Sequence, residues 1–74
     1  MQKLDAFNLS RGQWEFLIDQ WIIGQNSERD RQIMKRRLLD GVSFDRLADE
    51  FMLSRPQIER IVYKGQTKVF AHTK

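Results

Sequence analysis

The sequence predicts an all-α, four-helix domain, and two features of its pattern carry this prediction. Four serines each stand directly before a stretch in which apolar residues recur every three or four positions, which is the period of an α-helix. Serine is also a good N-cap, because its hydroxyl accepts a hydrogen bond from a backbone N–H that lacks a partner inside the helix. These serines are Ser10, Ser27, Ser43 and Ser54. We therefore expect an N-terminal arm, 1–10, and a helical domain, 11–74, with helices at about 11–23, 28–40, 44–51 and 55–71.

Length and composition narrow the class of protein. A chain of 74 residues has room for one domain, and its hydrophobic content of 41% fits a globular fold. The absence of cysteine excludes disulfides and thiolate metal sites. No apolar run approaches the roughly 18 residues of a membrane-spanning helix, and the N-terminus lacks the apolar segment of a signal peptide. We therefore expect a cytoplasmic protein that has no membrane partner.

The first helix is expected to carry two apolar faces. Its larger face is predicted to enter the core and consists of Trp14, Leu17, Ile18 and Trp21. Phe16 and Ile23 fall on the opposite face, which Leu4 and Phe7 of the arm, or a second chain, would cover. A homodimer through this helix therefore stays open.

The second helix is predicted to start after its cap, Ser27, and to bury a stripe that includes Ile33. Acidic residues in its first turn and basic residues in its last turn suit the helix dipole. Arg37 lies on the same face as Ile33. We expect its side chain either to pair with an acid such as Asp45 or to extend outward to solvent.

Residues 44–64 are predicted to form two helices that cross steeply at a tight turn. Ala48 is a small residue on the inner face of the shorter helix, so another helix can approach it closely. Leu53 is expected to be buried in the turn, and a capping box at 54–57 starts the next helix. Gly65 falls on the apolar stripe of that helix and is predicted to be a close-packing position. Such a helix-turn-helix holds its second helix outward, so that the N-terminal half can enter the major groove.

Charge alternates along the chain. Residues 29–40 carry five basic and two acidic groups, and residues 54–74 carry five basic and one acidic group. The segments 1–28 and 41–53 are net acidic. This pattern indicates a polarised surface of the kind that nucleic-acid-binding proteins present, and a plain scatter of solvated charge is the alternative.

The stretch 27–70 resembles region 4, the C-terminal DNA-binding region of bacterial sigma factors; it reads SERDRQIMKRRLLDGVSFDRLADEFMLSRPQIERIVYKGQTKVF. The resemblance lies in the order of elements, in DGVSF at 40–44, in LADEF at 47–51 and in LSRPQI at 53–58. The chain is especially similar to the short stand-alone sigma-like proteins of bacterial mobile elements and phages. The resemblance implies that the last helix reads double-stranded promoter DNA and that RNA polymerase is a further partner. The family usually has glycine in the turn, where this chain has Met52.

The outer face of the last helix carries the side chains expected to contact DNA. Arginine can bond guanine O6 and N7, glutamine can bond adenine N6 and N7, and glutamate can accept from cytosine N4. The residues assigned to base edges are Arg55, Gln57, Glu59 and Arg60. The residues assigned to phosphates are Tyr63, Lys64 and Lys68, together with Lys35 and Arg36 of the second helix. Two alternatives remain open, in which Gln57 serves only the capping box and Glu59 only pairs with a neighbour such as Arg55.

The residues offer no pattern typical of catalysis. The chain has one histidine, no cysteine and no glycine-rich phosphate loop. We therefore expect neither an enzyme nor a cofactor or metal site. The alternative function is a protein-interaction module, which keeps the fold and contacts RNA polymerase or another regulator without reading DNA.

Overall fold

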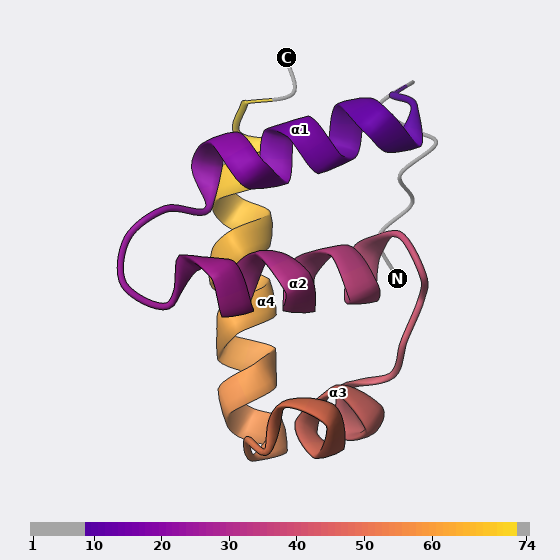
Figure 1. Cartoon of the computed structure of the whole chain (residues 1–74), viewed down its shortest axis with the longest axis vertical. Helices are drawn as coiled ribbons and strands as arrows, with labels where there is room; N and C mark the ends of the chain where they lie inside the picture. Colours follow the sequence, from indigo (N-terminus) through magenta and orange to yellow (C-terminus); the bar gives the residue numbers. More distant parts are fainter. Residues whose placement is uncertain (1–8, 73–74) are drawn as a thin grey trace.

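Four helices make up most of residues 9–72, the part of the chain that the computed structural model describes. They are α1 (Arg11–Trp21), α2 (Ser27–Leu38), α3 (Phe44–Phe51) and α4 (Arg55–Phe70). Figure 1 shows α1 and α2 side by side, α4 crossing both at a steep angle, and α3 packed at the far end of α4. The prediction of an all-α, four-helix fold is confirmed. Within these residues, no helix combines the length and the apolar composition that crossing a membrane requires.

The core lies where α4 crosses the other helices. Its fully buried side chains are Trp14, Ile18, Ile33, Met34, Leu47, Ile58, Val62 and Val69. Fully burying one such side chain stabilises the fold by about 1.5–3 kcal/mol. All four helices contribute to this cluster, so none of them can leave without exposing apolar surface.

Three of the four predicted serine caps are present. The Ser10 hydroxyl accepts a hydrogen bond from the backbone N–H of Gln13 at 3.2 Å, and the Gln13 side chain accepts one from the Ser10 N–H at 2.8 Å. Ser43 caps α3 through the backbone N–H of Arg46. Ser54 caps α4 with a full capping box, as predicted. The sequence thus specifies where these three helices begin.

The predicted cap at Ser27 is wrong, because Ser27 is the first residue of α2 and Asn26 is its N-cap. Asn26 adopts the left-handed region with φ 64, and Gly24 has φ 104. The turn that results brings the Ser27 N–H to 3.2 Å from the Gly24 carbonyl. One of the N–H groups that a helix start leaves open is satisfied in this way. At its other end α2 stops at Leu38 rather than at residue 40.

The first helix ends at Trp21, before the predicted residue 23. Ile22 has an extended backbone with φ −91 and ψ 91, and its carbonyl accepts a hydrogen bond from Arg31 Nε at 2.7 Å. The Ile22 side chain is buried. Ile23, predicted on the second face of the helix, instead lies in the connection after it and is 62% exposed.

Of the two residues predicted on the second apolar face of α1, Phe16 lies on the helix, and it is 65% exposed. The predicted cover by Leu4 and Phe7 concerns residues outside the described part of the chain. Trp21, predicted as a core residue, is only half-buried. Its ring stacks on His72, with ring centroids 3.5 Å apart and planes 3° from parallel.

Gly65 lies where α4 crosses α2, and it is buried. A Cβ atom at this position would lie 2.5 Å from the sulfur of Met34, well inside van der Waals contact. A Cβ atom at this position would therefore force the Met34 side chain to shift. The prediction that Gly65 is a close-packing position is confirmed, and α4 continues through it to Phe70.

Candidate nucleic-acid interface

A tight turn joins α3 to α4 and fixes their relative direction. Met52 follows α3 in the left-handed region, with φ 56 and ψ 42. The Leu53 N–H donates to the Ala48 carbonyl at 3.0 Å, and the Met52 N–H donates to the Asp49 carbonyl at 3.4 Å. This pair of bonds is a Schellman motif, which most often has glycine in the left-handed position. Met52 takes that place with its side chain 91% exposed.

α4 buries one stripe and exposes the opposite one. The buried stripe is Ile58, Val62, Gly65 and Val69. At about 100° per residue, the middle of the opposite side falls on Pro56, Arg60, Tyr63, Lys64 and Thr67, all of them exposed. Figure 1 shows that the N-terminal half of α4 extends beyond α1 and α2 and has α3 beside it. The polar stripe is therefore open to solvent from the first turn onward.

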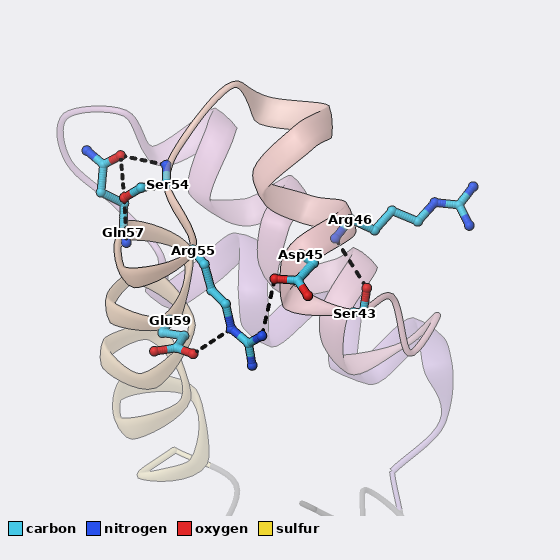
Figure 2. Close-up of polar contacts among 7 residues, drawn as sticks. All are labelled: Ser43, Asp45, Arg46, Ser54, Arg55, Gln57 and Glu59. Carbon is cyan, nitrogen blue, oxygen red and sulfur yellow. Dashed lines mark hydrogen bonds and ion pairs between the residues drawn. The ribbon is translucent and has the colours of Figure 1, made fainter.

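Arg55 lies between two carboxylates at the start of α4. Its Nε donates to Glu59 at 2.9 Å, one turn further along the same helix, and its Nη1 donates to Asp45 of α3 at 3.2 Å (Figure 2). The hydrogen bond to Glu59, and after it the charge of Asp45, raise the pKa of the Arg55 guanidinium above its ordinary value. The group stays charged at neutral pH, and its Nη2 makes no hydrogen bond within the described residues.

An aromatic ring on α3 supports this side of α4. The Arg37 guanidinium lies 4.3 Å from the centroid of the Phe44 ring, and that of Arg55 lies 5.7 Å from it. The Tyr63 ring meets Phe44 edge-on, with centroids 5.9 Å apart. The two predicted alternatives for Arg37 are wrong, because its Nη1 donates to the Val42 carbonyl at 3.0 Å and Asp45 pairs with Arg55 instead. The Arg37 guanidinium thus has a backbone carbonyl and the Phe44 ring as its partners in place of an exposed carboxylate.

The two other base-edge candidates of the first turns have partners of their own. The Gln57 Oε1 accepts from the Ser54 N–H at 2.9 Å, so Gln57 acts in the capping box. Its amide nitrogen faces away from Ser54 in Figure 2. Glu59 is half-buried and turned toward Arg55. The structure therefore places Glu59 as the partner of an arginine, at the flank of the exposed stripe.

Lys35 and Arg36, the predicted phosphate contacts of α2, both form ion pairs. Lys35 Nζ lies 2.8 Å from a carboxylate oxygen of Asp19 on α1. Arg36 forms a two-pronged pair with Glu50 of α3, in which Nε donates to Oε1 at 3.0 Å. To bind a phosphate, Lys35 or Arg36 would have to give up its carboxylate partner. The net free-energy gain is therefore smaller than for a cation that has no such partner. Both residues belong to α2 and neither is part of the exposed stripe of α4.

Arg60, Lys64 and Lys68 differ from Arg55, the other basic residue of α4. In residues 9–72, the ion pairs involve none of the three. They follow one another at intervals of four residues, so they rise along one side of the helix at about 6 Å per step. This row is the most available positive charge on α4.

Arg46 is a residue that the sequence analysis did not single out. Its side chain is 73% exposed, and its nearest acidic group, Glu50, is 3.8 Å away. Figure 2 shows it extending from the start of α3 into open space, away from Arg55. The available signal was its position three residues after the cap Ser43, which brings it to the first turn of the helix before the tight turn.

Among residues 9–72, no group of three or more His, Asp or Glu side chains is arranged to hold a metal ion. Comparison with known proteins yields no matching family model, no matching curated protein and no matching solved structure. The interface is therefore described by its geometry alone: an open polar stripe on α4 that includes Arg60 and Lys64, with Arg55 at its flank and Lys68 one turn beyond Lys64.

Proposed function

We propose that this chain binds double-stranded DNA with sequence preference and acts in bacterial transcription regulation inside the cell. The N-terminal half of α4 lies in the major groove, in the manner of a sigma region 4-like helix-turn-helix. The observation that carries this proposal is the open polar stripe of α4, which begins beyond α1 and α2 and lies opposite the buried Ile58, Val62 and Val69. An α-helix fits the major groove, where base edges present a readable pattern of donors and acceptors.

Residue roles follow from the positions of the side chains. Arg60 lies at the middle of the exposed stripe, so its guanidinium meets base edges first. Arg55 contributes its free Nη2 at the flank, while Glu59 and Asp45 hold its orientation rather than contacting bases. Lys64, Lys68 and Tyr63 extend to phosphates.

Contacts to phosphates alone position a protein without reading sequence. The proposal therefore needs the polar side chains of the first two turns as well as the cations. Arg46 is a further phosphate contact from α3 in this proposal, since its side chain is 73% exposed and its pair with Glu50 is long, at 3.8 Å.

The test is selection of bound duplexes from a random library, followed by fluorescence anisotropy on the enriched duplex and on a scrambled one. We expect an enriched motif, and an affinity that falls with salt at a log–log slope of roughly −4 to −5 for four to six neutralised phosphates. Arg11→Ala on α1 is the matched control, because Arg11 is an exposed arginine remote from the stripe. A library without any enriched motif, bound with no salt dependence, would refute the proposal.

A second candidate function is contact with RNA polymerase, and the exposure of Phe16 favours it. Phe16 borders a hollow of about 490 Å³ with Leu9, Leu17 and His72, and exposed aromatic side chains are enriched among the anchors of protein interfaces. Pull-down with purified core RNA polymerase, comparing the native chain with Phe16→Ser, tests this. Equal capture of both variants, or capture of neither, rejects a role for this surface.

A further inference from the structure

A second hollow lies on the opposite flank of α4 from Arg55. Its volume is about 350 Å³, and it opens between α4 and the connection that follows α1. Its lining includes Ile23, Ile61, Arg60, Lys64, Lys68 and Asp30. The hollow is a feature of the tertiary fold, because its two walls are far apart in the sequence.

One wall is cationic. Arg60, Lys64 and Lys68 stand along it at about 6 Å intervals, and none of them has an acidic partner within the described residues. The acidic residue of the lining, Asp30, already pairs with Arg29 at 3.1 Å. The hollow therefore has an uncompensated positive charge along one side.

The hollow also has an apolar lining, which comes from both of its walls. Ile23 is 62% exposed, although its neighbour Ile22 is buried. Ile61 is half-buried, on the flank of α4 that faces the hollow. Covering apolar surface of this kind gains about 25 cal/mol per Å². A duplex could neutralise the cations, but the charged phosphates that do so are poor cover for an apolar side chain such as Ile23.

We propose that this hollow is the docking site of an acidic amphipathic helix from a protein partner. Carboxylates spaced by one helical turn on the partner meet the cations, whose own spacing is also one turn. An apolar side chain on the adjacent edge of the partner helix packs against Ile23 and Ile61. A ligand of this one kind both neutralises the cations and covers the exposed isoleucine.

Docking also has a consequence for regulation, which rests on the proposed function. Arg60 and Lys64 belong to both the hollow and the polar stripe assigned to DNA. A partner helix lying on them competes with the duplex, because the same charges cannot be neutralised twice. The acidic partner would therefore release the chain from DNA.

The probe is a labelled synthetic helix with Glu at every fourth position and Leu along the adjacent edge; a peptide of the same composition in scrambled order is its control. We expect saturable binding of the probe by anisotropy, weaker binding of the scrambled peptide, and a loss of about tenfold in affinity with Ile23→Ser. Lys68→Ala should weaken binding several-fold, while Arg11→Ala should leave it unchanged. Circular dichroism verifies that each variant is folded, and Ile23 is exposed enough to be replaced safely.

Duplex binding is measured on the same variants, so that the two proposals can fail separately. Ile23→Ser should bind the selected duplex as the native chain does, and the probe should displace that duplex. Absence of probe binding, equal binding of the scrambled peptide, or no effect of Ile23→Ser overturns the docking site, and the last two results mark the row as a general anion contact. Probe binding that depends on Ile23, without binding to any duplex, supports the docking site and rejects the proposed function.

Discussion

Arg55 of α4 donates a hydrogen bond to Asp45 of α3 across the tight turn, with 3.2 Å between Nη1 and the carboxylate oxygen. This contact ties the first residue of the proposed recognition helix to the helix before it. Both side chains are more than half exposed, so the pair contributes little to stability. Its effect is on the direction of the guanidinium, which is also held by Glu59.

The first prediction concerns this bracing. Glu59→Gln removes a negative charge that lies near the phosphates of a bound duplex and loosens Arg55. We expect affinity for a scrambled duplex to rise by about threefold to tenfold, as for one fewer repulsive charge, and the preference for the selected duplex to shrink. Anisotropy on both duplexes measures the two effects.

Glu15→Gln is the matched control, because Glu15 forms an i,i+4 pair with Arg11 on α1, remote from the stripe. A Glu59→Gln variant that loses affinity for every duplex would instead indicate that Glu59 accepts directly from a base. That result would restore the base-edge role expected from the sequence.

The second prediction separates base contacts from phosphate contacts. Arg60→Ala should cost about 1–3 kcal/mol on the selected duplex and relax the preference at one position of the site. Lys64→Ala should weaken selected and scrambled duplexes alike and reduce the salt slope by about 1. Titrations at several salt concentrations distinguish the two patterns. If Arg60→Ala weakened both duplexes equally, Arg60 would be a phosphate contact.

The third prediction concerns the turn itself. Met52 has φ 56, a conformation that disfavours residues with a Cβ atom by about 1–2 kcal/mol. Met52→Gly removes that strain, and the greater freedom of glycine in the unfolded chain offsets part of the gain. We expect a net stabilisation of up to about 1 kcal/mol by urea denaturation.

Asp49→Gly, within the last turn of α3, is the matched control and should not stabilise the chain, because its backbone is helical and glycine is the poorer helix former. Because the Met52 side chain is 91% exposed, its removal leaves no cavity. A Met52→Gly variant less stable than the native chain would mean that the left-handed conformation is not strained here.

The sequence predicted the elements better than it predicted the contacts between them. Helix starts at Ser10, Ser43 and Ser54 are local, because each cap bonds a backbone group three residues ahead. The start of α2 could not be predicted in this way. Its N-cap, Asn26, adopts the left-handed region because of the shape of the loop, and it makes no side-chain cap bond. Nothing in the order of residues near Ser27 reveals that shape.

The polar contacts of the candidate interface were the least predictable part. The sequence placed Arg55, Glu59 and Arg60 on the outer side of one helix by periodicity. It did not indicate that Asp45 would turn to Arg55 while Arg37 bonded a backbone carbonyl. An exposed ion pair stabilises the fold by only about 0–1 kcal/mol. The packing of the helices therefore decides which charged side chains meet. That packing cannot be predicted from the periodicity of the sequence.

The last prediction tests the crossing on which the exposed stripe depends. Glycine inside a helix is normally less favourable than alanine by about 1 kcal/mol. Gly65→Ala would therefore stabilise the fold if there were room for the added methyl group. Here the new Cβ would lie 2.5 Å from the Met34 sulfur, and Met34 is fully buried. We expect net destabilisation by about 1–3 kcal/mol, typical of overpacking.

Met34→Ala alone should cost about 2–5 kcal/mol through its cavity. The double variant should be more stable than the sum of the two losses predicts, since the added methyl group occupies part of that cavity. Additive losses in urea denaturation would show that the two residues do not share this space.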